Sequence, residues 1–266
     1  MSELTPAGLY RNWPRRDHVA MAGVFSLRHH RKRHNVYSPF AQEIYMRVAL
    51  LGGTGDIGEG LALRLGYDTD HELIIGSRDP DRARDSAAEY KTEIESRGRD
   101  VTISGAGNAE ATADADVVVA GVPAYYLSDT IESVADEFDG SILVSPAVGM
   151  KREDDGLSYN PPGVGSVTAL AAGAAPDGVP VVGAFHNLAA GRLANLDADL
   201  GWDVPVVGED SDAKQTVMSL TGDITGLRAL DAGGLGNASE VEAVTPLLIN
   251  LAANNEGMHD LGVSFR

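Results

Sequence analysis

Short apolar runs and longer amphipathic segments follow one another along most of the chain. Residues 48–51 form a continuous apolar run, which is typical of a strand buried on both faces. From Asp56 onward, Ile57, Leu61 and Leu65 are spaced four residues apart, which predicts a helix with one apolar face. A second strand is predicted to end at Ser77 and Arg78, and further strands at 100–104, 116–123, 141–146 and 181–185. This alternation predicts an α/β fold with a doubly wound, mostly parallel sheet.

Residues 186–266 continue the alternation in a smaller α/β segment. Strands are predicted at 202–207 and 226–230, on either side of a helix at about 212–220. Asn237 and Glu240 resemble a capping box, which predicts the start of a last helix. The apolar stripe of this helix is interpreted as core or dimer contact, and it consists of Val241, Val244, Leu247, Leu248 and Leu251. Between the fifth and sixth strands, residues 151–178 are predicted to be a loop followed by an alanine-rich helix.

A glycine-rich turn joins the first predicted strand to the first helix. The sequence Gly-Thr-Gly-Asp-Ile-Gly runs from Gly53 to Gly58 and has the spacing of a dinucleotide-binding turn. In this interpretation Gly53 permits the tight turn, Gly55 lets the backbone approach a pyrophosphate, and Gly58 lets helix and strand pack closely. The N–H groups at the helix start face the pyrophosphate, and Asp56 is expected to point to solvent. Strand, spacing and helix together favour a Rossmann-type nucleotide site over a glycine turn that binds nothing.

The end of the second strand indicates which dinucleotide binds. An Asp or Glu at this place would accept a hydrogen bond from the ribose 2′-hydroxyl of NAD. Ser77 and Arg78 are donors instead, and donors suit the 2′-phosphate of NADP. The sequence therefore predicts NADP(H) as the cofactor.

A second arginine follows on the next predicted helix, which begins at Pro80 with Asp79 as its N-cap. Arg82 lies four residues after Arg78, so both guanidinium groups can converge on one phosphate. The alternative interpretation has Arg82 and Arg84 on a solvated helix face, paired with neighbouring carboxylates.

Charge is distributed unevenly between the start of the chain and the rest. The 266 residues carry a formal net charge of −18, but residues 1–45 carry +4 and the remainder −22. The remainder has only three lysines, so its carboxylates suggest the surface of a halophilic protein from a high-salt cytoplasm. This acidity argues against a nucleic-acid partner. No cysteine is present, which excludes thiol catalysis, disulfides and cysteine-based metal sites. No apolar run is long enough to span a membrane, so we expect a cytoplasmic protein without a membrane partner.

The first 45 residues show neither helical nor strand periodicity. Arg15 and Arg16 before an apolar stretch suggest a twin-arginine export signal, but RHHRKRH replaces the small-residue cleavage region and disfavours it. A basic RNA-binding arm is a second interpretation. The interpretation we favour is a basic, disordered extension, with Met46 as the true first residue.

Several runs of the sequence resemble one known family. They are MRVALLGGTGDIGEGLALRL, the strand ending GSR, FHNLAAGRLANLD, and the late stretch from WDVPVVGEDSDAKQTVMSL to GLRALDAGGLGNA. Over residues 46–266 the chain resembles the NADPH-dependent reductases of the deazaflavin coenzyme F420. The resemblance implies reversible hydride transfer between NADP(H) and this coenzyme by a homodimeric enzyme. It also implies an NADP-binding Rossmann domain at 46–185 and a smaller domain at 186–266 that contributes to the deazaflavin pocket and the dimer.

The resemblance further implies which residues hold NADP. It assigns the pyrophosphate to Thr54, Gly55, Asp56 and Ile57, which follow the cofactor-binding Gly53 of the glycine motif. It assigns the 2′-phosphate to Ser77, Arg78 and Arg82. It assigns the ribose and nicotinamide to Gly121, Val122, Pro123, Val148 and Ala184. This sequence departs from the family pattern at Asp56, where an uncharged residue is usual, and at Ala124 and Tyr125, which replace a bulkier aromatic and a polar residue.

Hydride transfer of this kind needs little side-chain chemistry. The two rings must stack in a dry cleft, and neither a nucleophile nor a metal is required. His186, Asn187 and Leu188 are predicted to line the deazaflavin pocket. His186 is the candidate catalytic residue, as a proton donor or as a hydrogen-bonding group, although a histidine satisfied by backbone at a strand end is the commoner case. Arg192 and Arg228 are candidates to bind the acidic tail of the deazaflavin.

Two other functions stand as alternatives. One is another NADPH-dependent reductase on the same fold, acting on a metal, an imine or a hydroxy acid. A lysine acid for such a reaction is disfavoured, because Lys91, Lys151 and Lys214 fall on predicted surface elements. The other alternative is a non-catalytic NADP-binding redox sensor, which would need an effector domain that residues 46–266 do not suggest.

Overall fold

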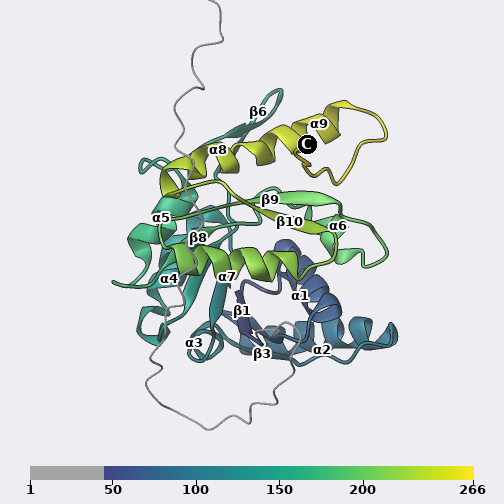
Figure 1. Ribbon diagram of the computed structural model, residues 1–266, viewed down its shortest axis with the longest axis vertical. Helices are drawn as coiled ribbons and strands as arrows, with labels where there is room; N and C mark the ends of the chain where they lie inside the picture. The colour runs from purple at the N-terminus through teal and green to yellow at the C-terminus, as the bar shows by residue number, and fades with distance from the viewer. Residues whose placement is uncertain (1–44) are drawn as a thin grey trace, which may run out of the picture. The chain divides into compact units, whose positions relative to one another are not determined.

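The computed structural model describes residues 45–266, in which helices cover both faces of one mixed sheet (Figure 1). Within these residues eight strands are ordered β10-β9-β8-β5-β4-β1-β2-β3. Neighbouring strands are parallel except β8 and β9, which run antiparallel. The strands of this sheet are β1 Arg47–Leu51, β2 Glu72–Ser77, β3 Ile103–Gly107, β4 Val117–Ala120, β5 Ile142–Ser145, β8 Val181–Gly183, β9 Trp202–Gly208 and β10 Leu227–Asp231. The predicted doubly wound α/β fold is confirmed.

Most of the predicted helices are present, and three short 3-10 helices accompany them in the described part of the chain. The α-helices are α1 Asp56–Asp68, α2 Pro80–Ser96, α3 Asn108–Thr112, α4 Leu127–Glu132, α5 Val167–Ala174, α6 Ala190–Ala194, α7 Ser211–Gly222, α8 Ala238–Glu242 and α9 Val244–Asn254. The 3-10 helices are η2 Ala124–Tyr126, η3 Ala135–Glu137 and η4 Leu235–Asn237. Among residues 45–266 no helix combines the length and the hydrophobicity needed to cross a bilayer.

Strand β1 lies at the centre of the sheet and shows why helices cover both faces. Val48 and Leu50 pack into one apolar cluster, together with side chains of α1, α2 and α7. Ala49 and Leu51 pack into a second cluster, together with α3, α4 and α5. Successive side chains of a strand point to opposite faces, so an apolar run without alternation requires cover on both. From β1 the strand order runs outward to β2 on one side and to β4 on the other, which makes the carboxyl end of β1 the switch point where Rossmann-type sheets bind ligands.

Strand β3 lies three residues beyond its predicted position, at Ile103–Gly107 instead of 100–104. Glycine weakens a strand in sequence-based reasoning, and this strand contains two. A Cβ on Gly105 would lie 2.3 Å from the carbonyl carbon and oxygen of Ala83 on α2. Close packing of helix against strand therefore requires the glycine that the sequence rule penalises.

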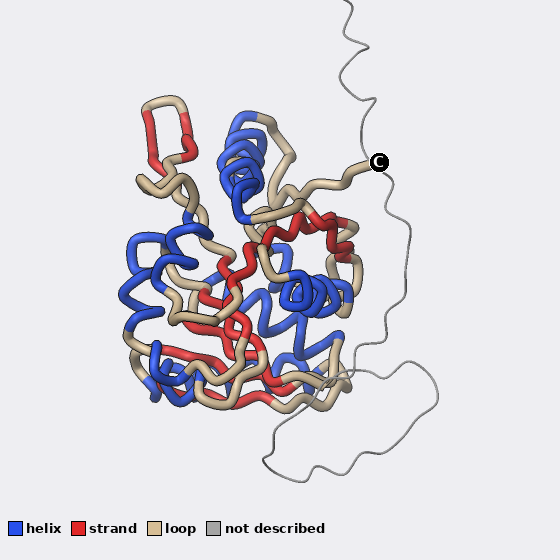
Figure 2. Tube along the Cα trace, turned by 60° about the vertical axis from the view of Figure 1, so that its left-hand side comes forward, coloured by secondary structure: helices blue, strands red, loops and turns tan. Residues whose placement is uncertain are grey.

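A two-stranded antiparallel hairpin replaces much of the loop predicted after the fifth strand. Its strands are β6 Met150–Glu153 and β7 Gly156–Tyr159, and Figure 2 shows it projecting beside the last helix. The side chain of Asn250 on α9 accepts from the backbone N–H of Leu157 at 2.8 Å and donates to its carbonyl at 2.7 Å. The hairpin edge is thus paired with a helix far along the chain, which is why local sequence did not reveal it.

The predicted capping box at Asn237 is wrong. The Asn237 side chain donates to the carbonyl of Ala232 at 2.7 Å and makes no cap contact, while Glu240 accepts from the hydroxyl of Ser239. The last helical region is also divided into α8 and α9. In its predicted apolar stripe Val241 is buried, but Leu247 and Leu251 are 56% and 42% exposed. Core packing therefore accounts for only part of the stripe.

Strands β9 and β10 extend the same sheet, and the described residues 45–266 belong to one compact unit. The predicted division into two domains after residue 185 accordingly stays a proposal. The sequence predicts that the first 45 residues are a basic, disordered extension. Residues 1–44 of this segment lie outside the described residues, so the interpretation stays a prediction.

Candidate cofactor-binding site

The glycine turn between β1 and α1 is folded tightly against the end of β2. The N–H groups of Gly52 and Gly53 both donate to the carbonyl of Gly76, at 3.0 and 3.1 Å. Gly52 has φ +73, so the left-handed residue of the turn precedes Gly53, to which the sequence motif assigned the tight turn. A Cβ on Gly58 would lie 2.5 Å from the Cα of Gly53, so close packing of helix and turn excludes any larger residue there.

The N-terminus of α1 is open to an anion. Its N-cap, Gly55, makes no side-chain cap hydrogen bond, and both Gly55 and Asp56 are exposed. A Cβ on Gly55 would be no closer than 3.4 Å to any atom of the protein, so packing does not require glycine at this position. Close approach of a ligand to the backbone does require it. Uncapped N–H groups and the helix dipole favour a phosphate at this place.

For Arg82 and Arg84 the sequence left two interpretations open, phosphate binding or a solvated helix face, and the two arginines differ in this respect. The Arg82 guanidinium reaches from α2 to the glycine turn and donates to the carbonyl of Thr54 at 3.3 Å. Arg84 instead pairs with Asp81 at 2.6 Å, and both side chains are more than half exposed. Arg82 therefore lies beside the proposed phosphate site, whereas Arg84 belongs to a solvated ion pair.

The end of β2 presents the donors that the sequence predicted. Asp79 caps α2 by accepting from the N–H groups of Asp81 and Arg82, as expected. The Ser77 hydroxyl oxygen accepts from the N–H of Asp79 at 3.1 Å, which leaves its proton available to donate. The Arg78 guanidinium lies 5.2 Å from the ring centre of Tyr126 on η2, within cation–π range. This ring holds Arg78 at the edge where the 2′-phosphate is expected.

The residues predicted to follow the ribose and nicotinamide lie at the carboxyl ends of three neighbouring strands, β4, β5 and β8. A Cβ on Gly52 would lie 2.8 Å from the carbonyl of Gly121 and from Val122, so the β4 loop borders the glycine turn. Pro123 is exposed and Val148 is half-buried. Ala184 is fully buried within the core, so its side chain offers no surface to a ligand.

His186, Asn187 and Leu188 form a buried turn directly after β8. Nε2 of His186 lies 3.2 Å from the hydroxyl of Thr168, so a side chain and not the backbone satisfies this nitrogen. Burial lowers the pKa of His186 to about 4, and the ring is therefore neutral at neutral pH. A neutral ring bound to Thr168 disfavours the role of proton donor and leaves the hydrogen-bonding role.

The two arginines considered for the deazaflavin tail have partners within the protein. Arg228 donates two bonds of 2.7 Å to Asp203, and it holds the pKa of that carboxyl below its usual range. Arg192 donates to the carbonyl of Asp199 through two nitrogens. These contacts disfavour Arg228 in particular, because its charge is already compensated.

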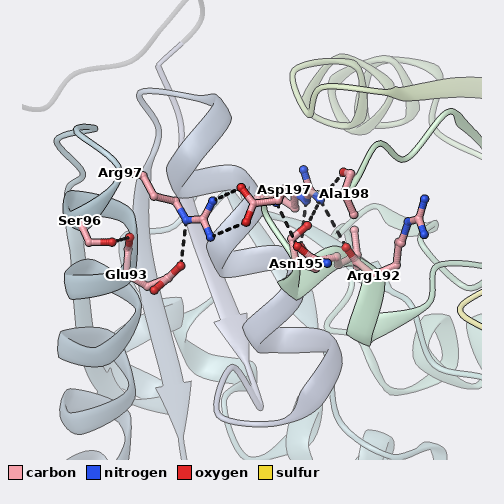
Figure 3. A network of polar contacts seen from close by, with 9 residues as sticks. Glu93, Ser96, Arg97, Arg192, Asn195, Asp197 and Ala198 are labelled. Carbon is pink, nitrogen blue, oxygen red and sulfur yellow. Dashed lines mark hydrogen bonds and ion pairs between the residues drawn. The ribbon is translucent and has the colours of Figure 1, made fainter.

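A residue that sequence reasoning missed connects helix α1 to the segment after His186. Arg64 on α1 is 4% exposed, and its guanidinium donates to four backbone carbonyls, those of Arg192, Leu193, Asn195 and Ala198. Figure 3 shows this segment, in which Asp197 also accepts two bonds from Arg97. In the sequence, only the position of Arg64 within the apolar stripe of α1 indicated that this arginine is buried.

Comparison with known proteins shows which family the chain is similar to. Residues 47–149 match the family described as NADP oxidoreductase coenzyme F420-dependent. The F420-dependent NADP reductase of Methanocaldococcus jannaschii is 38% identical over 208 residues, which cover 77% of this chain and 92% of that protein. The chain belongs to the family of F420-dependent NADP reductases.

A second relative is the F420-dependent NADP reductase of Methanothermobacter marburgensis. It is 39% identical over 213 residues, which cover 79% of this chain and 94% of that protein. A solved structure from Arthrobacter sp. FB24 shares the fold, with a TM-score of 0.68 at 24% identity over 83% of this chain and 99% of that one. A pyrroline-5-carboxylate reductase from Coxiella burnetii has a TM-score of 0.50 at 16% identity, covering 76% and 64% of the two chains.

Proposed function

We propose that this protein transfers a hydride reversibly between NADP(H) and the deazaflavin coenzyme F420. The observation that carries the proposal is the 38% identity to a named F420-dependent NADP reductase over 77% of the chain. The donors Ser77 and Arg78 at the end of β2 support the choice of NADP over NAD, since NAD would call for a carboxylate there.

The residues around the glycine turn fit a phosphorylated dinucleotide. The pyrophosphate would lie at the open N-terminus of α1, against backbone of Gly53 to Ile57. The 2′-phosphate would be held by Ser77, Arg78 and Arg82, the last of which already reaches the turn. The ribose and nicotinamide would follow the β4 loop at Gly121 to Pro123 and Val148, with the backbone of Ala184 behind them.

Bound nicotinamide and deazaflavin supply the hydride chemistry, so the protein acts by positioning. The phosphate contacts fix one end of the dinucleotide, and the loops after β4, β5 and β8 orient the other. His186, Asn187 and Leu188, all three buried, would form the wall against the deazaflavin. With a neutral imidazole, that wall would offer hydrogen bonds and no acidic proton.

A spectroscopic assay tests this function. Purified protein mixed with NADPH and oxidised F420 should bleach the deazaflavin absorbance, and NADH should be a much poorer donor. NADPH binding without reduction of F420 would favour the redox-sensor alternative. Oxidation of NADPH only by imines, hydroxy acids or metal complexes would instead favour another reductase, and either result would reject the proposal.

The proposed homodimer would use the exposed apolar side chains of the last helix. Leu247, Ile249 and Leu251 on α9 are 56%, 40% and 42% exposed, and Met150 at the start of β6 is 40% exposed. We also propose that residues 186–266 act as the smaller domain that carries this contact. Light scattering should give the mass of two chains for the wild type and of one chain for Leu247→Glu. A dimer that withstands Leu247→Glu as well as it withstands the surface control Lys91→Glu would contradict this interface.

We propose a high-salt cytoplasm as the setting of this enzyme, because the chain has 39 acidic against 21 basic residues. At roughly 1 M salt the Debye length is about 3 Å, so long-range repulsion is screened while the short contacts of Arg78 remain. Removing salt should lower both the unfolding temperature and the affinity for NADP(H). Circular dichroism and cofactor titration across a salt series measure these effects, and equal stability and affinity in dilute buffer would refute the halophilic interpretation.

A further inference from the structure

A buried series of hydrogen bonds leads from the last helical region to the proposed deazaflavin pocket. Glu242 on α8 and Thr168 on α5 are fully buried, and His186 is 3% exposed. The Thr168 hydroxyl donates to Oε1 of Glu242 at 2.9 Å and lies 3.2 Å from Nε2 of His186. Burying a carboxyl group and an imidazole has a cost, so the arrangement calls for an explanation beyond packing.

The carboxyl group of Glu242 is surrounded by donors. The backbone N–H groups of Val167 and Thr168 donate to it at 3.0 and 2.9 Å. The Tyr159 hydroxyl donates to it at 2.9 Å, and burial together with this contact raises the pKa of the phenol, which keeps its proton. Glu242 thus accepts four hydrogen bonds, including that from Thr168.

This arrangement determines where the proton of His186 lies. A threonine hydroxyl has one proton, and Thr168 commits it to Glu242. Towards His186 the Thr168 oxygen can then only accept, so Nε2 of the imidazole must be the protonated nitrogen. In the neutral ring Nδ1 is consequently an acceptor with a lone pair.

The backbone around His186 is also constrained. Phe185, directly before it, has φ +68, a left-handed conformation that is strained for a bulky residue. The Thr245 hydroxyl donates to the carbonyl of His186 at 2.7 Å. A strained residue maintained by its surroundings at the end of a strand is typical of a functional turn.

Two acceptors on this turn have no partner in the described structure. Nδ1 of His186 is buried and unpaired, and so is Oδ1 of Asn187. The amide of Asn187 is oriented by its donation to the carbonyl of Asp203 at 2.8 Å, so Oδ1 is correctly placed as the acceptor. Buried acceptors without partners are rare in native proteins, which points to a ligand that brings donors.

We propose that Glu242, acting through Thr168, fixes His186 as its Nε2–H tautomer, so that Nδ1 accepts a hydrogen bond from an amide-type N–H of the bound redox ring. This inference rests on the proposed function for the identity of the ring. Two sources carry such an N–H, the carboxamide of the nicotinamide and the pyrimidine edge of the deazaflavin. Because both acceptors are buried, a neighbouring side chain must shift when the ring binds. Thr168 and Glu242 are positioning residues, and only His186 and Asn187 would touch the ligand.

The tautomer is tested on the protein without ligand. In ¹⁵N-histidine spectra, assigned by the signal lost in His186→Gln, Nε2 of His186 should appear protonated and Nδ1 unprotonated. Thr168→Val keeps the shape and removes the hydroxyl, so it should yield a mixture of tautomers, whereas Thr168→Ser should restore the wild-type spectrum. A protonated Nδ1 in the wild type, or an unchanged spectrum in Thr168→Val, would overturn the inference.

The ligand contact is tested by adding NADP⁺ alone and oxidised F420 alone. One of the two should move the Nδ1 resonance, and Thr168→Val should weaken the binding of that ligand about tenfold, the effect of one lost hydrogen bond. Thr168→Ser should bind as the wild type does. If neither ligand moves the resonance, Nδ1 is not their acceptor. If the protein fails to reduce F420, the proposed function fails separately, because the tautomer and the NADP⁺ titration do not depend on turnover.

Discussion

Arg78→Ala is expected to weaken the binding of NADP(H) about a hundredfold and to leave the binding of NADH nearly unchanged. A guanidinium can give a phosphate two charge-assisted hydrogen bonds, each worth roughly 1.5 to 3 kcal/mol, and about 1.4 kcal/mol is a factor of ten in affinity. Arg78 lies at the end of β2 against the ring of Tyr126, so its charge is held where the 2′-phosphate is expected. The ratio of kcat/KM for NADPH and NADH measures the effect.

Arg84→Ala is the matched control for this prediction. Arg84 is an arginine of α2 close in sequence to Arg78, but it pairs with the exposed Asp81. Its loss should leave both cofactors unaffected. Arg82 is intermediate between Arg78 and Arg84, because its contact with the Thr54 carbonyl places it near the expected phosphates. Arg82→Ala should therefore lower the affinity for NADPH, but by less than Arg78→Ala does. Equal losses for NADPH and NADH in Arg78→Ala would mean that the arginine supports the fold and not the 2′-phosphate.

Arg64→Met is expected to destabilise the protein by about 3 to 5 kcal/mol, because several buried carbonyls lose their donor and each unsatisfied group costs roughly 1 to 3 kcal/mol. The guanidinium satisfies four backbone carbonyls of residues 192–198, and methionine fills a similar volume without any donor. Unsatisfied buried carbonyls are costly, since each loses its solvation without regaining a hydrogen bond. Urea unfolding monitored by tryptophan fluorescence measures the loss, with Trp202 packed against the core.

Two further variants define what Arg64 contributes. Arg64→Lys keeps the charge but has no planar fork, so it should recover only part of the stability. Arg97→Ala removes the arginine that binds Asp197 on the same segment. It should have little effect, because Asp197 is 78% exposed and ion pairs open to solvent contribute little. If Arg64→Met were as stable as Arg97→Ala, the four carbonyls would find other hydrogen-bond donors, and the prediction would be wrong.

Arg64 is also expected to matter for function, because α1 begins at the proposed phosphate-binding turn and carries Arg64 in its second half. The segment that Arg64 holds follows the turn of His186, Asn187 and Leu188. A rigid connection between the two sites would fix the dinucleotide and the deazaflavin pocket relative to each other. Loss of Arg64 should therefore lower kcat/KM for F420 even at temperatures where the variant remains folded.

The sequence by itself determined the parts of the protein that depend on neighbouring residues. The apolar run of β1, the glycine spacing, the N-cap at Asp79 and the donors Ser77 and Arg78 lie within one βαβ unit. Local periodicity and capping determine the strand, the turn and the helix start. The donor groups of Ser77 and Arg78 determine which ligand suits the site. For this reason the fold class and the NADP preference could be predicted from the order of residues alone.

Only the tertiary structure decided the features that join distant residues. Position 105 in β3 requires glycine because α2 packs closely against it, and the hairpin β6–β7 is bonded to Asn250 of α9. Arg64 meets carbonyls about 130 positions away, and Thr168 meets a carboxylate 74 positions away. No periodicity records such pairings, because a hydrogen bond between distant residues depends on where the packed sheet brings them, and the residue types alone do not specify that position.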